Sequence, residues 1–433
     1  MKKHLLALSA AAVLLVPQAV GAEGFAINEW TAEGMAMGGA RMFAENDAGN
    51  MAYNPAAMTK IQGEKFKASV SYLSPHGKWD ATSKETTLSD GTKLPEMNYS
   101  GRNRVNPGIV PGLYYVKQLN DKEWLGMATY TRFGMICQFE RDSIVATNAF
   151  SSRLNGTSIA MNYARKHDSK WSTSIGAEIN YVGLQYDKNL AYPHLGQGGP
   201  LHLEGTSWAL GWNAAANYEF DDKNEFAVVY RSKVKHSMEA EYDAHGMATV
   251  LPGAAMGSAY PAFGSEGDVY GCVTLPESWM LGYGHRFNDK TRVELNATWT
   301  RWSRFDAFAM TFSPSGAGYS FTSPNSKNWE DGWRYAIGIE HKLSDKYSLM
   351  AGIAHDERSI PDETADFMVP TGERDTYTIG VQYHDKKQTV ALALGYMDVG
   401  ELNMTGHDTD SYKEAKMYDS YTKMVAISYQ YNF

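Results

Sequence analysis

The feature that most limits the fold of this chain is a regular alternation of apolar and polar residues over long segments. Val293, Leu295 and Trp299 fall on one face of such a segment, with polar residues between them. The segments 171–181 and 390–396 alternate in the same way. A period of two places each kind of side chain on one face of a β-strand. Strands in soluble sandwiches average about five or six residues. These segments run nearer ten, the length at which a strand crosses a membrane.

The first residues predict a cleaved secretory leader. Lys2 and Lys3 precede an apolar run at 5–16, and a small-residue cleavage pattern ends at Ala22. The alternative is a membrane anchor, but this run is shorter than the about 20 residues that a spanning helix needs. We therefore expect residues 1–22 to be a signal peptide and the mature chain to begin at Glu23.

The composition suits a barrel wall in lipid. The chain has 27 Tyr, 11 Trp, 16 Phe and 40 Gly, and its hydrophobic content is only 43%. Lipid-facing residues that alternate with polar lumen residues, and aromatic girdles at both interfaces, produce this profile. Acidic side chains outnumber basic ones by 49 to 40, which argues against nucleic acid as a partner because phosphate binding needs a basic surface.

Short polar turns give a strand count. Asn and Asp satisfy local backbone groups at tight reversals. Six segments read as such turns: 120–122, 167–170, 221–224, 288–290, 344–346 and 385–387. Two strands before the first turn, two between successive turns and two after the last give 14 strands. An even count with short turns on one side is the bacterial outer-membrane pattern, with the short side in the periplasm. The long loops are then expected outside the cell, at 74–106, 140–155, 187–205, 239–271, 305–328, 357–374 and 400–420.

The last residues support a closed barrel. Val425, Ile427 and Tyr429 share one face, and the chain ends at Phe433. A terminal aromatic residue after alternating apolar residues resembles the signal that the barrel-assembly machinery recognises. Closure is required in lipid because an open sheet edge leaves backbone groups unpaired.

Residues 23–64 do not alternate and are rich in Gly, Ala and Met. A barrel of this size has a lumen wider than its own wall side chains can fill. We therefore predict that 23–64 is a helical hatch that plugs the lumen of a barrel formed by 65–433. The alternative is a periplasmic tail, but the segment is too apolar for a typical disordered tail.

Several motifs then resemble one family, that of the FadL long-chain fatty acid transporters. The mature start, 24–29, resembles the opening of that family, and 46–50 with Asn54-Pro55-Ala56 resembles its hatch signature. Phe25, Asn28 and Glu29 belong to the first of these motifs. Further matches lie, in the right order, at 211–214, 230–235, 275–279, 299–303, 333–338 and 353–356.

The resemblance implies a 14-stranded barrel with a lumenal hatch. It also implies capture of ligand among extracellular loops, transfer to an internal apolar pocket, and sideways exit through a kinked third strand. The run Arg132-Phe133-Gly134-Met135 interrupts the alternation of the predicted third strand, 127–139. Gly in a strand often marks a bend, so Phe133 and Gly134 are the candidates for the kink. The candidates for the loop groove are apolar residues of two predicted loops, Leu195, Leu201, Leu203, Leu251, Met256, Tyr260 and Phe263. The alternative is that these loops only pack on each other.

The sequence indicates the substrate less directly than the fold. The positions where fatty-acid members place basic groups align with Gly183 and Glu330 here. A carboxylate in an apolar pocket needs a cation or several donors. Arg132, Arg301 and Arg334 are the candidate partners, although Arg301 and Arg334 equally suit ordinary lumenal ion pairs. A neutral ligand is the alternative, because the family includes uptake channels for aromatic hydrocarbons such as toluene.

Other classes of outer-membrane protein are disfavoured. No Gly-x-Ser-x-Gly elbow is present and the 12 His residues are scattered, so we expect no enzyme. A general porin has no use for a hatch. No metal or other cofactor is indicated. We expect a monomer in contact with outer-membrane lipid and lipopolysaccharide. Cys137 and Cys272 are read either as a disulfide near one rim or as two unrelated thiols.

Overall fold

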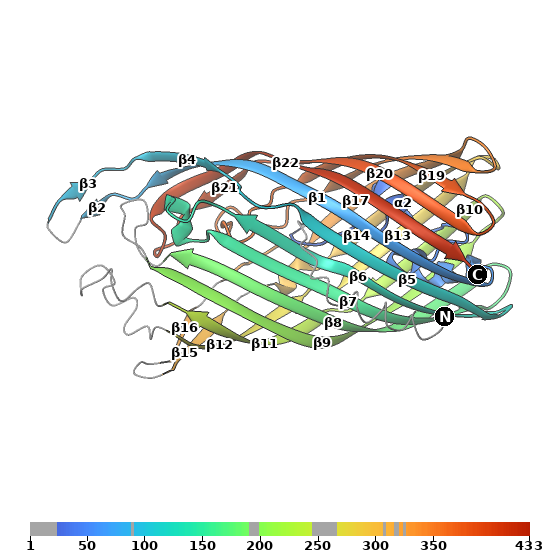
Figure 1. Ribbon diagram of the computed structural model, residues 1–433, viewed down its shortest axis with the longest axis horizontal. Helices are drawn as coiled ribbons and strands as arrows, with labels where there is room; N and C mark the ends of the chain where they lie inside the picture. The colour runs from blue at the N-terminus through green and yellow to red at the C-terminus, as the bar shows by residue number, and fades with distance from the viewer. Residues whose placement is uncertain are drawn as a thin grey trace.

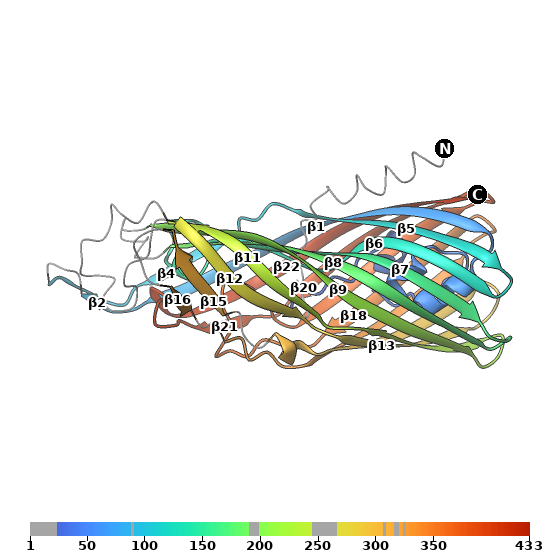
Figure 2. The same cartoon turned by 90° about the horizontal axis from the view of Figure 1, so that it is seen from below.

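The computed structural model describes residues 24–87, 91–189, 199–244, 266–305, 309–315, 320–323 and 326–433. One antiparallel sheet curves round and closes on itself (Figure 1, Figure 2). Its first strand, β1 (Glu64–Ser83), pairs with its last, β22 (Tyr412–Asn432), along nearly their whole lengths. The predicted signal peptide lies outside the described residues.

The other elements follow in chain order. Ahead of the barrel stand α2 (Ala32–Ala36), α3 (Asn50–Tyr53) and the 3-10 helix η1 (Pro55–Lys60). The first half of the wall and its loops contain β2 (Thr86–Thr87), β3 (Lys93–Leu94), β4 (Asn98–Arg102), β5 (Gly108–Asn120), β6 (Glu123–Gln138), η2 (Ile144–Thr147), β7 (Ser151–Lys166), β8 (Trp171–Asn189), β9 (Pro200–Glu219), β10 (Asn224–Arg231) and β11 (Val234–Asp243). The second half contains β12 (Glu266–Leu275), β13 (Ser278–Arg286), β14 (Thr291–Thr300), η5 (Trp302–Arg304), β15 (Met310–Pro314), β16 (Phe321–Ser323), β17 (Gly332–Lys342), β18 (Tyr347–Asp356), β19 (Arg374–His384), β20 (Gln388–Val399) and β21 (Leu402–Thr405).

Several wall strands are interrupted and then continue in the same direction. The interrupted strands are β4 with β5, β10 with β11, β12 with β13, β14 with β15, β16 with β17, and β20 with β21. Taken as continuous, the wall has 14 antiparallel strands, which confirms the predicted count and fold class. In the part of the chain that the structure describes, no helix is long and apolar enough to cross a membrane.

All six predicted turns join neighbouring strands at one end of the barrel. Their Asp and Asn side chains hold the reversals: Asp168 Oδ1 accepts hydrogen bonds from the backbone N–H groups of Lys170 and Trp171. These bonds lower the pKa of the Asp168 carboxyl. The local chemistry of the turns therefore accounts for the success of the strand count.

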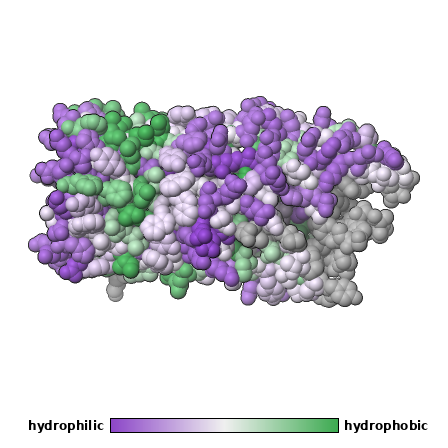
Figure 3. Space-filling view, turned by 180° about the vertical axis from the view of Figure 1, so that it is seen from behind, coloured by the Kyte–Doolittle hydropathy of each residue, from purple (hydrophilic) through white to green (hydrophobic). Residues whose placement is uncertain are grey.

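The predicted loop boundaries were wrong, because the strands run far into the segments assigned to loops. β1 extends to Ser83, β9 begins at Pro200 and β11 extends to Asp243. In β11 the exposed residues Glu239 and Glu241 alternate with buried Met238 and Ala240. The wall therefore continues past the membrane with a charged outer face. In Figure 3 hydrophobic residues gather in a band near one end, and hydrophilic residues cover much of the rest.

Aromatic side chains mark the border of the apolar band. Tyr230 pairs with Trp279, Trp279 with Trp299, and Trp299 with Trp333, across four neighbouring strands. Amphipathic rings favour the interface between hydrocarbon and water, so this row marks the outer surface of the membrane. On the side of the row toward the short turns, the outward residues are mainly aliphatic, such as Leu295 and Ile337.

Candidate functional site

The hatch lies inside the barrel, near the end that carries the short turns and the C-terminus (Figure 1, Figure 2). Two of its signature residues, Asn54 and Pro55, shape the hatch itself. Asn54 caps η1 by accepting a hydrogen bond from Ala56 N (3.1 Å), and Pro55 fills the first helical position, where no N–H is needed. The Asn54 amide also donates to Met42 O (3.0 Å). Asn54 and Pro55 therefore hold the preceding hatch loop at Met42 and begin η1.

Replacing Asn54 with alanine is expected to loosen η1 while the barrel stays intact. The change removes the helix cap and leaves the buried Met42 carbonyl without its donor, at a combined cost of roughly 1–3 kcal/mol. Hydrogen exchange should therefore become faster for the η1 amides but not for those of the wall strands. Asn403→Ala, at an exposed strand position, is the control. Unchanged exchange in η1 would contradict a capping role for Asn54.

Inward-facing glycines of the wall make room for the hatch. A Cβ on Gly352 would lie 2.1 Å from the backbone carbon of Met37, and one on Gly126 would lie 2.5 Å from the sulfur atoms of Met51 and Met58. The backbone contact at Gly352 excludes any side chain larger than hydrogen, and a side chain at Gly126 would require Met51 and Met58 to move. The wall is therefore shaped to receive this hatch segment, as expected for a plug and not for a periplasmic tail.

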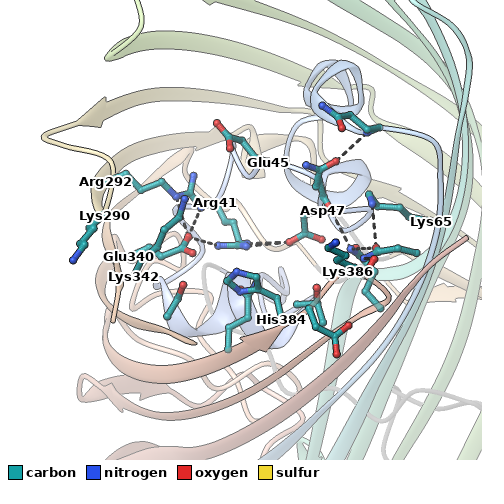
Figure 4. A pocket seen from close by; sticks show the side chains of 18 of the residues that line it. Arg41, Glu45, Asp47, Lys65, Lys290, Arg292, Glu340, Lys342, His384 and Lys386 are labelled. Carbon is teal, nitrogen blue, oxygen red and sulfur yellow. Dashed lines mark hydrogen bonds and ion pairs between the residues drawn. The ribbon is translucent and has the colours of Figure 1, made fainter. Parts of the chain in front are cut away.

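Buried ion pairs fasten the hatch to the wall. Lys67 of β1 contacts Glu33 of α2 (2.8 Å) and Asp47 of the hatch (2.5 Å). Arg41 of the hatch contacts Asp47 (3.1 Å) and Glu340 of β17 (3.2 Å). These pairs lie at the base of the lumen, as Figure 4 shows for Arg41, Asp47 and Glu340.

The neighbouring cations determine the direction of the Asp47 pKa shift. Burial alone raises the pKa of Asp47, but the Lys67 ammonium and the Arg41 guanidinium outweigh burial and lower that pKa below its ordinary value. A carboxylate whose pKa is lowered by folding stabilises the folded state at any pH above its pKa in the unfolded chain, which is about 3.9 for Asp. That stability is lost only as the pH falls through the lowered pKa. The Asp47 attachment is therefore complete throughout the neutral range.

The third wall strand, β6, is irregular at Arg132, the first residue of the segment that interrupts the alternation. Thr131 pairs with Thr157 of β7 and Phe133 pairs with Gly156, so Arg132 is the extra residue of a bulge. On its other side β6 pairs with β5 only as far as Leu113 with Thr129. Pro111, which has no N–H to donate, lies in β5 just beyond that last pair. The wall ladder between β5 and β6 therefore stops part-way up the barrel.

The hatch pairs with part of the β6 edge that β5 does not cover. Ile27 N donates to Arg132 O (2.9 Å) and Gly134 N donates to Phe25 O (2.8 Å). These two bonds flank a short antiparallel bridge between Ala26 and Phe133. The start of the hatch thus lies against the bulge, and its position is linked to this part of the wall.

Phe25 is the centre of a buried aromatic cluster at the same place. Its ring packs edge-on against Phe133 (5.9 Å between centroids), Trp302 (4.9 Å) and Phe305 (5.2 Å), with Trp329 beside them. All are buried, and they belong to a larger apolar cluster that fills the extracellular half of the lumen. Apolar side chains gathered inside the lumen suit contact with a hydrophobic ligand.

Arg132 also belongs to a buried charged group. Glu178 of β8 accepts hydrogen bonds from Arg132 (3.2 Å) and from Arg231 of β10 (2.9 Å), and also from Tyr130 and Asn213. Among the described residues one carboxylate therefore balances two guanidinium groups, which leaves one surplus positive charge beside the aromatic cluster. Sequence reasoning missed Glu178 and Arg231. The sequence signal that could have found them is a charged residue at an inward position of an alternating strand.

The other two candidate arginines lie elsewhere. Arg334 donates to the Gly38 carbonyl of the hatch (2.7 Å) and pairs with Asp356 (3.0 Å), so it holds the hatch. Arg301 pairs with Glu277 (3.1 Å) and lines an outward-facing hollow with Trp279 and Trp299. Arg301 therefore lies at the membrane border and not in the lumen.

Leu201 and Leu203 were expected in a loop groove but are buried on the inner face of β9, within the apolar cluster. The remaining groove candidates, Leu195, Leu251, Met256, Tyr260 and Phe263, lie outside the described residues.

A disulfide is not formed: Cys137 is buried in β6 and Cys272 is exposed on β12, and both thiols are free. The strand alternation turns these two side chains to opposite faces of the wall.

A closed antiparallel barrel with a lumenal hatch, an apolar band and an aromatic girdle defines a bacterial outer-membrane protein. Over residues 13–433 the sequence matches the family described as "Outer membrane protein transport protein (OMPP1/FadL/TodX)", and the chain belongs to this family. It is an outer-membrane transporter of hydrophobic compounds.

The relatives agree with this assignment. The chain is 24% identical to the long-chain fatty acid transport protein of Escherichia coli strain K12, covering 90% of each chain. It is 26% identical to outer membrane protein P1 of Haemophilus influenzae, covering 92% of this chain and 90% of the relative. In fold it is similar to a Pseudomonas aeruginosa FadL homologue (TM-score 0.80, 17% identity, 95% of this chain and 100% of that one). It is also similar to the toluene transporter TodX of Pseudomonas putida (TM-score 0.66, 17% identity, 94% and 99%).

Proposed function

We propose that this protein carries long-chain fatty acids passively across the outer membrane and releases them sideways into the membrane between β5 and β6. The observation that carries the proposal is the position of the aromatic cluster around Phe25, directly beside the bulge at which the β5–β6 ladder stops. An apolar ligand held in that cluster has the irregular part of the wall next to it. The alternative substrate is a neutral aromatic hydrocarbon such as toluene.

The charged base of the hatch argues against a straight path to the periplasm. Below the aromatic cluster a ligand would meet the pairs that Lys67 and Arg41 form with Glu33, Asp47 and Glu340. Separating buried ion pairs to admit an acyl chain costs several kcal/mol and returns no compensating contact. Sideways release keeps the ligand in apolar surroundings throughout.

The surplus positive charge at Arg132 and Arg231 favours a carboxylate over a neutral ligand. A fatty acid head group would be the second counter-charge of this group, beside Glu178. The indole N–H groups of Trp302 and Trp329 are buried and have no hydrogen-bond partner among the described residues, so they are further donors for an anion. The names of the sequence relatives, long-chain fatty acid transport proteins, point the same way.

The remaining steps also belong to the proposal. Capture would take place among the extracellular loops that contain Leu251 and Tyr260, and Leu201 and Leu203 would line the route inward. We propose a monomer that the barrel-assembly machinery inserts among outer-membrane lipid and lipopolysaccharide. No energy source is required, because the ligand moves down its own gradient.

Binding to purified protein tests the substrate. The protein in non-ionic detergent is expected to bind a long-chain fatty acid more tightly than toluene, and native mass spectrometry should detect co-purified fatty acid. The fatty acid methyl ester is the matched control, because it keeps the chain and removes the charge. Equal affinity for acid and ester, together with tight binding of toluene, would instead identify a hydrocarbon channel.

A further inference from the structure

A hollow of about 600 Å³ lies on the outer, lipid-facing surface of the wall, at the aromatic row that marks the membrane border. Its lining combines short side chains with large aromatic rings: Ala214, Ala216 and Val228, and Trp212, Tyr230, Trp279 and Trp299. Glu277 and Arg301 complete the lining on the extracellular side. The aromatic cluster around Phe25 faces the lumen, so the transport route proposed above does not use this hollow.

The hollow exists because two outward positions of β9 carry alanine. Ala214 pairs with Tyr230 of β10, and Ala216 pairs with Val228. Elsewhere in the membrane band the outward positions carry large side chains, such as Ile337 and Ile379. The rings of Tyr230 and Trp279, with centroids 4.8 Å apart, project beside the alanines. A saturated acyl chain that enters this gap gains contact with alanine methyl groups and with the aromatic rings.

Two arginines stand next to the hollow on its extracellular side. Arg301 follows β14 and Arg304 ends η5, and both contact the carboxylate of Glu277, Arg301 at 3.1 Å and Arg304 at 3.5 Å. No other described residue forms an ion pair with either guanidinium group. The two arginine side chains are 42% and 37% exposed, whereas that of Glu277 is only 10% exposed. Guanidinium N–H groups therefore remain accessible to an anion from outside the barrel.

The lumenal side of the wall holds these two arginines in position. Trp302 lies between them in the sequence, is 0% exposed, and packs edge-on against Phe25 at 4.9 Å. Because Trp302 fixes η5 in the aromatic cluster, Arg301 and Arg304 project from a well-anchored segment. A site built on an anchored segment loses less conformational freedom when it binds a ligand.

Charge is distributed unevenly around the arginines. Glu330 and Asp331 lie just before β17, and Glu357 just after β18, so these carboxylates are all on the β17 side. On the other side, the pairs that flank the β10–β11 interruption place Lys233 opposite the segment that contains Glu277. Lys233 is exposed and forms no ion pair with any described residue. Positive charge therefore extends from the arginines toward β10 and β11, over the hollow.

We propose that this part of the outer surface binds lipopolysaccharide, with a lipid phosphate at Arg301 and Arg304 and an acyl chain of the same molecule in the hollow. The planar fork of a guanidinium group matches the oxygens of a phosphate. Basic pockets at the level of the lipid head groups recognise anionic lipids in this way. The aromatic row places the site at the outer surface of the membrane, where lipopolysaccharide is the lipid that carries phosphate next to saturated chains.

Titration of the full-length protein in non-ionic detergent with lipopolysaccharide that lacks O-antigen tests this site, with native mass spectrometry as the readout. Saturable binding of one molecule is expected. The double variant Arg301→Gln with Arg304→Gln should bind about tenfold more weakly or worse, since hydrogen bonds between charged groups are lost. Arg104→Gln is the matched control, because Arg104 is also an exposed arginine with a glutamate partner, at a distance from the hollow. It should leave the affinity unchanged.

A second variant tests the hollow without altering any charge. Ala214→Trp fills the hollow and should also weaken binding. Tryptophan is favoured at the membrane border, so this variant should fold like the native protein. Ile379→Trp, at a lipid-facing position of β19, is its control and should bind normally.

Several results would overturn the proposal. These are absence of saturable binding to the native protein, native affinity of the double arginine variant, and native affinity for dephosphorylated lipopolysaccharide. Displacement of bound lipopolysaccharide by an equal amount of phosphatidylglycerol would also overturn it, because the site would then accept any anionic lipid. Fatty acid takes no part in this experiment, so its outcome is independent of the transport proposal.

Discussion

Deletion of Arg132 is expected to abolish uptake of long-chain fatty acid, whereas Arg132→Gln should allow uptake to continue. Arg132 is the extra residue opposite β7, between Thr131 and Phe133. Its deletion restores a regular register, so β6 can straighten and continue its ladder with β5 beyond Thr129. The glutamine variant keeps the bulge and removes only the charge. Uptake of labelled fatty acid by cells that express each variant at equal levels measures the difference.

The same glutamine variant separates binding from release. Without the Arg132 guanidinium, Glu178 and Arg231 form a balanced pair and the surplus positive charge disappears. A hydrogen bond to a charged group contributes about 1.5–3 kcal/mol. Affinity for fatty acid should therefore fall roughly ten- to a hundredfold, while affinity for toluene should not change. Arg165→Gln, at an exposed ion pair near the end of β7, is the matched control.

Each of the two variants tests a different part of the proposal. Normal uptake by the deletion variant would mean that ligand does not leave between β5 and β6. Native affinity of Arg132→Gln for fatty acid would place the head group elsewhere, next to a cation other than Arg132. Loss of uptake in both variants with native binding in Arg132→Gln would point to a structural role for the arginine at the bulge.

The wall of this barrel was predictable because its signals are local. Alternation fixes which residues face inward, and Asp168 and its counterparts fix the turns through hydrogen bonds to residues two or three positions away. The sequence also points to an irregular segment in β6, since Arg132-Phe133-Gly134-Met135 interrupts the alternation. Which of these residues is the extra one could not be predicted, because the extra residue is defined by its pairing with β7.

The lengths of the strands and the partners of the charged residues were not predictable in the same way. Beyond the membrane the wall keeps its apolar inner face, so alternation continues and cannot show where the lipid ends; Leu201 and Leu203 were misplaced for this reason. Ion pairs such as Glu178 with Arg231 join residues 53 positions apart, and no periodicity relates them. Arg301 was misjudged because it lies just past the end of β14, where alternation no longer assigns a face.

Replacement of Lys67 with methionine is expected to detach α2 from the wall. Glu33 is 0% exposed, and Lys67 is the cation that contacts its carboxylate at 2.8 Å. Removing one partner of a buried ion pair leaves an uncompensated charge and costs about 3–5 kcal/mol. Asp47 still contacts Arg41 at 3.1 Å, so the damage should centre on α2. Hydrogen exchange of the α2 amides should become roughly a hundredfold faster or more, with the wall strands unaffected.

The double variant Lys67→Met with Glu33→Gln tests the cause. Both charges are then absent, so the isolated buried carboxylate of the single variant no longer exists, and exchange in α2 should return most of the way to the native rate. The coupling between the two positions is the difference between the double variant and the sum of the single ones. Additive effects would mean that Lys67 supports the hatch by packing alone. Native exchange in Lys67→Met would mean that the glycine contacts at Met37, and not the ion pairs, hold the hatch in the lumen.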